Sequence, residues 1–222
     1  MALGECLLSG YGVERDSGAA LKWFTQAAEQ GRVTTQCFLG QCLAEGFVFG
    51  VTNSEAAVEW FRKATGNGAP DGMYGLGQCY QNGWGVEKNL ATAVEWYGKA
   101  AQCGQLQAQT ALGLCYENGW GVEKDVVAAE KFFRQAAKKG WEDAEYHLGR
   151  FYYEGIVVEK DPAEAVRLWR SASWFFHDRA DYMLGVCYER GEGVEKDLEM
   201  AREHYRRSGN EDARKALERL GR

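Results

Sequence analysis

Apolar residues recur three and four positions apart along the whole chain, in runs separated by short segments rich in glycine and polar residues. Residues 108–140 show the pattern most clearly, with one apolar face on each side of a glycine-rich break at 119–121. A spacing of three and four residues is the period of an amphipathic helix, and no stretch alternates as a half-buried strand would. The sequence therefore predicts pairs of helices joined by short turns.

A glycine preceded by leucine marks the period of these helix pairs. It occurs at Gly4, Gly40, Gly77, Gly113, Gly149, Gly185 and Gly221, at intervals of 36 residues and once of 37. Glycine inside a helix costs about 1 kcal/mol relative to alanine, so its return predicts close approach of a partner helix. A period of this length is typical of a solenoid. We expect one domain over residues 1–222, cut from a longer protein, with both ends inside the first helix of a repeat.

The second helix of each pair begins at a preferred N-cap residue. The six positions are Asp16, Asn53, Asn89, Asp125, Asp161 and Asp197. Their side chains can accept hydrogen bonds from the first amide groups of a helix. In Asp161-Pro162-Ala163-Glu164, proline follows the cap and glutamate completes a capping box. Four second helices are predicted to end at C-cap glycines, namely Gly31, Gly68, Gly104 and Gly140.

The repeat unit resembles that of a known family. From Ala108 to Gly140 the chain reads Ala-x-x-x-Leu-Gly-x-x-Tyr, then Gly-x-Gly-Val-x-x-Asp, then Ala-x-x-Phe-Phe-x-x-Ala-Ala-x-x-Gly. This pattern resembles the Sel-1-like repeats, relatives of the tetratricopeptide repeats, and it extends over the entire chain. The resemblance implies an all-α fold, a right-handed α/α superhelical solenoid of about six 36-residue helix-turn-helix repeats. It also implies a non-enzymatic scaffold or adaptor for protein–protein interaction.

Charge and hydropathy narrow the range of partners. The formal net charge of −6 and the pI near 5.3 argue against nucleic acid, which usually needs clustered lysine and arginine. No apolar run is long enough to span a membrane, and the first four residues lack the basic and apolar segments of a signal peptide. We therefore expect a cytoplasmic protein without membrane insertion or nucleic-acid binding.

Five of the seven cysteines share one repeat slot, two residues after the glycine. These are Cys6, Cys42, Cys79, Cys115 and Cys187. Phe151 takes the same slot in the fifth repeat, which indicates an apolar packing position, because buried free cysteine behaves as a small hydrophobe. Cys37 and Cys103 do not complete the two-cysteine pattern of the disulfide-rich family members. We expect free thiols and a reducing compartment.

No residue pattern points to catalysis, a cofactor or a metal. The three histidines, His147, His177 and His204, are too scattered for a metal site. The glycine-rich turns around Trp84 and Trp120 follow helices, and no Gly-Lys-Ser/Thr completes a phosphate loop. No nucleophile emerges with a base beside it. We predict no catalytic, cofactor-binding or metal-binding residue.

A partner is expected on the concave face, which first helices line in stacked helix pairs. The slots three before and one, four and five after the repeat glycine vary in polarity, as a recognition surface does. They contain the predicted partner-binding residues Tyr74, Gln78, Gln81, Asn82, Thr110, Glu117, Asn118, Tyr146, Arg150, Tyr153, Glu154, Tyr182 and Glu189. Amides suit a peptide backbone and tyrosines offer rigid contact area. The glutamates favour a basic residue in a peptide or helix bound with micromolar affinity, near −8 kcal/mol. A solvated, inert helix face is the alternative.

Two segments break the repeat. Trp174-Phe175-Phe176 replaces the end of the fifth second helix and its C-cap glycine. Either these aromatic residues fill the joint with the sixth repeat, which we favour, or they form an exposed contact surface. The turn Gly46-Phe47-Val48-Phe49-Gly50 is one residue longer than its equivalents, and we expect it to alter local curvature only.

Three other functions stay open. The chain could be the regulatory or targeting repeat arm of a larger multidomain protein or enzyme, which flanking sequence would reveal. It could be an enzyme acting alone, which the missing acid, base and nucleophile argue against. It could be a structural spacer, whose groove would bind nothing. A repeat scaffold indicates where a partner lies without naming it.

Overall fold

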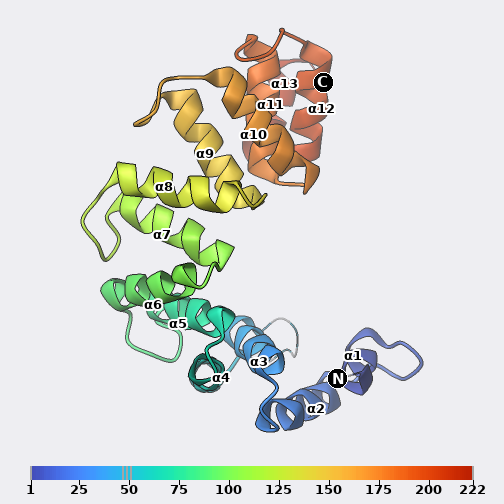
Figure 1. Ribbon diagram of the computed structural model, residues 1–222. Coiled ribbons are helices and arrows are strands. Elements are labelled where there is room, and N and C mark those ends of the chain that lie inside the picture. The colour runs from blue at the N-terminus through green and yellow to red at the C-terminus, as the bar shows by residue number, and fades with distance from the viewer. Residues whose placement is uncertain (1, 47, 49, 51, 222) are drawn as a thin grey trace. The chain divides into compact units, whose positions relative to one another are not determined.

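The computed structural model describes residues 2–46, 48, 50 and 52–221, and this part of the chain folds into thirteen α-helices without a strand (Figure 1). The first helices of the repeats are α1 (Ala2–Ser9), α3 (Val33–Glu45), α5 (Pro70–Asn82), α7 (Leu106–Asn118), α9 (Glu142–Glu154), α11 (Asp178–Arg190) and α13 (Glu211–Arg219). The second helices are α2 (Ser17–Glu29), α4 (Ser54–Gly66), α6 (Leu90–Gln102), α8 (Val126–Ala137), α10 (Pro162–Trp174) and α12 (Leu198–Ser208). The predicted all-α series of helix pairs is confirmed.

The helices form two compact units. Unit 1 comprises residues up to 115 together with 119–123, and unit 2 comprises residues 116–118 together with the chain from 124 onward. In unit 1, α4 packs between α3 and α5, and α6 packs on α5. In unit 2, α9 packs between α8 and α10, α11 packs between α10 and α12, and α13 packs on α12. Within each unit, these helices pack on their neighbours in sequence, as in repeats that cannot fold alone.

Capping side chains start the second helices where the sequence predicts. All six predicted N-cap side chains accept hydrogen bonds from the first turn of their helices. Asp125, for example, accepts from the amides of Val127 and Ala128, each at 2.9 Å. The predicted C-cap glycines have left-handed φ values: Gly31 83°, Gly68 76°, Gly104 83° and Gly140 75°. The N-caps are therefore confirmed. The C-cap residues are instead Gln30, Asn67, Cys103 and Lys138, and each predicted glycine follows its C-cap by one residue or, for Gly140, by two.

The repeat glycine allows close approach of the second helix, as predicted. A Cβ added to Gly77 would lie 2.4 Å from the ring of Tyr97. In unit 2, a Cβ added to Gly149 would lie 2.5 Å from the indole nitrogen of Trp169. Both distances are far shorter than a van der Waals contact, so any larger residue must displace a buried aromatic ring.

Gly221 departs from this rule, and the prediction that it lies inside a first helix is wrong. It follows α13, it is exposed, and its φ is 78°. The reason is the short second helix α12, which ends at Ser208 before the left-handed Gly209. Because α13 then begins as early as Glu211, it ends at Arg219, before the seventh Leu-Gly pair.

The cysteine slot is a packing position, as predicted. Cys42, Cys79, Cys115 and Cys187 are buried, and Phe151 is fully buried in the same slot. All seven cysteines, each within the described residues, are free. Burial raises the pKa of the Cys79 and Cys187 thiols to about 12, so both stay neutral.

The aromatic turn, defined as Trp174-Phe175-Phe176, does not fill a joint between repeats. Its three side chains are 80%, 57% and 83% exposed, respectively. The favoured interpretation of this turn as internal packing is therefore wrong. In the second irregular segment, Phe47 and Phe49 lie outside the described residues, so the expected change of curvature stays a prediction.

Candidate partner-binding surface

The predicted partner-binding residues share one side of the first helices, because their slots are four, three and one residues apart. We call this side the first-helix surface. The side chains of this surface become more exposed toward the C-terminal end of each helix. The tyrosines three before the glycine are half-buried, namely Tyr74, Tyr146 and Tyr182. The residues five after the glycine are exposed, namely Asn82, Asn118 and Glu154. Thr110 differs, since it is only 6% exposed and its hydroxyl donates to the carbonyl of Leu106. Thr110 therefore offers no surface to a partner.

The tyrosines of this surface rest on aromatic residues that follow them in the chain. The ring of Tyr74 lies 5.6 Å from that of Tyr97, and the ring of Tyr182 lies 5.8 Å from that of Tyr205. Tyr146 is stacked on His177 at 5.0 Å. These contacts restrict the rings before any partner arrives, which lowers the entropic cost of binding.

Polar residues four after the glycine accept the buried phenols of the second helices. Gln81 accepts the hydroxyl of Tyr97 at 2.7 Å, and Glu189 accepts that of Tyr205 at 2.7 Å. Burial raises the pKa of both tyrosines, so each phenol keeps the proton that it donates. The sequence analysis did not predict this internal role. The available signal was that each acceptor precedes its tyrosine by the same sixteen residues.

In unit 2, charged residues connect successive first helices. Arg150 on α9 pairs with Glu117 at the end of α7. Tyr153 on α9 donates to Glu192, which follows α11, and accepts from Arg190 at 3.3 Å. Burial and the bond to Glu192 raise the pKa of Tyr153 to about 12. Predicted partner-binding residues thus contact one another before any ligand is bound.

These pairs change the expectation of a basic residue in the ligand. Glu117 is neutralised by Arg150, and Glu189 is neutralised by Arg219 at 2.7 Å. Glu154, the third glutamate of the prediction, is exposed at the end of α9. The expectation therefore rests on Glu154.

A recess of about 290 Å³ lies in unit 2 where α11, α12 and α13 meet. Its walls include Tyr182, Glu189, Arg190, Tyr205, Lys215 and Arg219. Two of the predicted partner-binding residues therefore face a concave, mainly polar site. The sequence analysis missed Lys215 and Arg219, because it placed the seventh repeat glycine in their helix and so misaligned α13.

In α3, α7, α9 and α11, a buried polar side chain four residues before the glycine bonds to a neighbouring second helix. Gln36 donates to the carbonyl of Ala28 at 3.0 Å, near the end of α2. In unit 2 a carboxylate takes this slot, and Glu145 accepts the hydroxyl of Ser171 at 2.8 Å. Burial raises the pKa of Glu145. These side chains serve the fold.

Asp181, in the same slot of the next repeat, gathers a serine and a histidine without forming a catalytic triad. Asp181 is 2% exposed, and its Oδ1 accepts from Ser173 at 2.8 Å. The same oxygen lies 2.9 Å from Nδ1 of His204. A triad needs the imidazole to take the proton of the serine, whereas here both groups contact one carboxylate oxygen. Arg207, 3.5 Å from that oxygen, completes the cluster.

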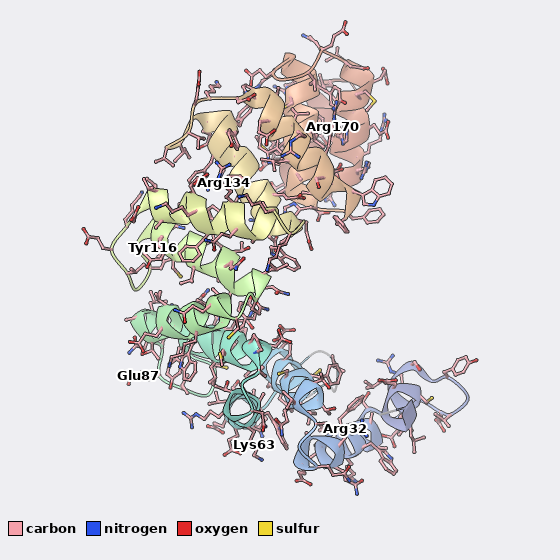
Figure 2. The ribbon with its side chains drawn as sticks, viewed as in Figure 1. Arg32, Lys63, Glu87, Tyr116, Arg134 and Arg170 are labelled. Carbon is pink, nitrogen blue, oxygen red and sulfur yellow. The ribbon has the colours of Figure 1, made fainter. Side chains whose placement is uncertain are left out.

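Second helices of unit 2 present arginines to the following first helix. Arg134 and Arg170, both labelled in Figure 2, project from α8 and α10. Arg134 donates to the hydroxyl of Tyr152 at 3.0 Å, and Arg170 donates to that of Tyr188 at 2.8 Å. These bonds fix neighbouring helices on the side that carries none of the predicted partner-binding residues.

Two further properties of the described residues bear on function. Within them, no three histidine, cysteine or acidic side chains come together as metal ligands. Each helix of the described chain is also too short or too polar to cross a lipid bilayer.

Family comparison agrees with the repeat pattern. The Sel1 repeat model matches residues 1–31, 34–68, 70–105, 106–141, 142–173 and 178–212. The six matches include nearly the whole chain. No curated protein shows significant sequence similarity to it.

Solved structures of repeat proteins resemble this chain along its length. A protective antigen of uropathogenic Escherichia coli with an SLR fold is 33% identical with a TM-score of 0.77, over 99% of this chain and 47% of the antigen. A Sel1 repeat protein from Oxalobacter formigenes is 31% identical with a TM-score of 0.88, over 99% of this chain and 64% of that protein. The chain thus spans less than two thirds of each. An immunity protein from Pseudomonas aeruginosa, 20% identical with a TM-score of 0.65 over 96% of this chain and 83% of its own, shares the fold.

Proposed function

Because the chain belongs to the Sel1 repeat family, whose members use their repeats for protein–protein interaction, we propose that it is a non-enzymatic scaffold. It binds an extended peptide or a helix on the first-helix surface. The observation that carries this proposal is the recess of unit 2, where Tyr182 and Glu189 face a concave site. A concave site with a few convergent polar groups is the usual form of a binding site.

The recess favours one kind of anchor. Arg190 and Lys215 supply donors, Arg219 balances the charge of Glu189, and Asp212 adds one carboxylate to the lining. Lys215 also pairs with Glu211 at 2.7 Å, but both groups are largely exposed, so this pair is weak. A carboxylate or amide side chain of the ligand fits these donors. A basic residue elsewhere in the peptide fits Glu154.

The experiment is a peptide-display selection on the whole chain, followed by calorimetric titration of the selected peptides. Tyr182→Ala combined with Arg190→Ala should weaken binding by roughly tenfold or more, because both residues line the recess. Tyr11→Ala is the matched control, since Tyr11 is a tyrosine 82% exposed outside the first-helix surface. Equal affinities for wild type and the double variant, with the fold intact by circular dichroism, would exclude this surface.

A second candidate is a regulatory or targeting arm of a longer protein. It is supported by the lengths of the relatives, since this chain covers 47% of the Escherichia coli antigen and 64% of the Oxalobacter protein. This candidate predicts that selected peptides match segments of the longer protein itself. A structural spacer predicts instead that the selection enriches no peptide.

A further inference from the structure

The aromatic turn combines two features that folding alone does not favour. In the four preceding repeats, the turn from the second to the next first helix has glycine in a left-handed conformation. Phe176 takes that slot here with a φ of 59°, a region that side chains with a Cβ rarely adopt. Trp174, two residues earlier, is 80% exposed, where the four preceding repeats have Glu29, Gly66, Gln102 and Lys138. Exposed aromatic residues gathered at one point mark an interaction site.

Unit 2 also contains an unfilled recess suited to an aromatic ring. Its volume is about 380 Å³, and it is lined by Arg206, Arg214, Leu217 and Glu218 between α12 and α13. Leu217 supplies an apolar wall. The two arginines can lie over an aromatic face, where a guanidinium interacts favourably with the ring.

The turn and this recess lie on neighbouring elements. The guanidinium of Arg207, near the end of α12, donates to the carbonyl of Ser173 at 2.9 Å. Ser173 directly precedes Trp174, and Arg207 directly follows Arg206, which lines the recess. One patch of unit 2 therefore offers both a projecting aromatic group and a cavity.

The charges around the two features have opposite sign. Beside Phe176 lie Asp143, which pairs with His177 at 3.1 Å, then Asp178 and one arginine, Arg179. The recess has two arginines and one glutamate. The turn is thus net acidic and the recess net basic, so the patch is complementary to itself.

We propose that the aromatic turn of one copy of this chain docks into the α12–α13 recess of a second copy, with the reciprocal contact completing a twofold dimer. A twofold interface uses the same patch on both subunits. Each aromatic side chain buries about 150–250 Å² when fully covered, so the three expose roughly 450 Å² per copy. Two reciprocal contacts that cover this area together with an equal area of the partner bury up to roughly 1,800 Å² in total, which is the size of a standard interface.

Sedimentation equilibrium from micromolar to sub-millimolar concentration tests the dimer. Phe176→Gly is the sharpest variant, because glycine adopts the left-handed turn without strain and occupies this slot in other repeats. It should keep the melting temperature or raise it, while weakening dimerisation roughly tenfold or more. Tyr11→Ala should dimerise as wild type does. A wild type that stays monomeric, or a Phe176→Gly variant that dimerises equally well, would overturn the proposal.

A mixing experiment tests which surfaces meet. Arg214→Glu changes the recess at an exposed helix position, so its fold should be retained. Alone, Phe176→Gly and Arg214→Glu should each be monomeric. Mixed, they should form a heterodimer through one intact contact, with affinity between those of the variants and wild type. A mixture that stays monomeric would contradict the pairing. Binding of the turn to zwitterionic phosphatidylcholine vesicles, without any dimer, would contradict the proposal and assign the turn to a membrane surface.

Discussion

Lys63 of unit 1 lies over Trp60 of its own helix, with the ammonium 4.1 Å from the ring centre, whereas Arg134 of unit 2 reaches Tyr152 on the next helix. A second contrast lies four residues after the repeat glycine. Gln81 of unit 1 accepts a phenol through a neutral amide, while Glu189 of unit 2 accepts one and also pairs with Arg219. Gln81 and Glu189 take the same slot, which unit 1 fills with a neutral amide and unit 2 with a charge that also reaches a further helix.

The repeat pattern therefore determines the backbone of each unit. The polar residues determine how the stability of each unit depends on pH and salt. A neutral contact, such as the bond from Tyr97 to Gln81, is insensitive to pH and salt. A charged contact between helices stabilises their packing and varies with both. All three histidines also lie in unit 2. We therefore expect unit 2 to be the pH-sensitive part of the molecule.

Substitution of the repeat glycine, which both units share, should have the largest effect on stability. Gly77→Val in unit 1 and Gly149→Val in unit 2 should each destabilise their unit by about 3 kcal/mol, because the new Cβ would overlap Tyr97 or Trp169. Hydrogen exchange resolved by peptide should show the loss in the mutated unit. An unchanged melting temperature for either variant would contradict the close-approach account of the repeat glycine.

The next prediction compares the two units at the slot four residues before the repeat glycine, where unit 2 has Asp181 and unit 1 has Gln109. Asp181→Ala should cost about 2–3 kcal/mol, because Ser173, His204 and Arg207 lose a common acceptor. Gln109→Ala should cost about 1 kcal/mol, since it leaves only the carbonyl of Ala101 without its donor. Chemical denaturation measures both. Equal losses in the free energy of unfolding would show that the charged slot of unit 2 contributes no more than the neutral slot of unit 1.

Acidification is the third test. His147 packs flat on Phe133, with ring centres 4.9 Å apart, and burial lowers its pKa from 6.5 to about 4. The unfolded chain is protonated first as pH falls, so this stability is complete above pH 6.5 and is lost toward pH 4. The loss between pH 6.5 and 4.5 is about 2 kcal/mol.

A variant isolates the histidine from other titrating groups of unit 2. The raised pKa of Glu145 acts in the opposite direction, because the folded chain then holds that proton more readily than the unfolded chain. His147→Met carries the side chain that Met183 provides in the next repeat. Its stability should fall less between pH 6.5 and 4.5 than that of wild type. Identical pH profiles would show that His147 is not the responsible group.

The smallest expected effect is that of Glu189→Gln, which gives unit 2 the residue of unit 1. The amide oxygen can still accept the phenol of Tyr205, so only the pair with Arg219 is lost. Arg219 is largely exposed, and the cost should stay below about 1 kcal/mol. Its dependence on salt should disappear with the charge. A loss of several kcal/mol in thermal denaturation would mean that Glu189 is a core charge.

Sequence alone predicted what depends on residues within one repeat. The caps at Asp125 and its equivalents, the glycine under Tyr97 and the cysteine slot all follow from short-range pattern and local sterics. What it missed depends on other repeats. Glu117 pairs with Arg150, thirty-three residues later in the chain. The early end of α12 shifts the start of α13 relative to the seventh Leu-Gly pair. The aromatic turn was misjudged because pattern shows an apolar run but not whether anything covers it.

Hydrogen exchange of the whole chain, with and without a selected peptide, tests whether the partner binds the first-helix surface. We predict that the peptide slows amide exchange in α11 and α13, which border the recess, and in α9, which carries Glu154. Exchange in α8 and α10 should be unchanged. Slower exchange confined to α8, α10 or the aromatic turn would contradict the claim that the first-helix surface binds the partner.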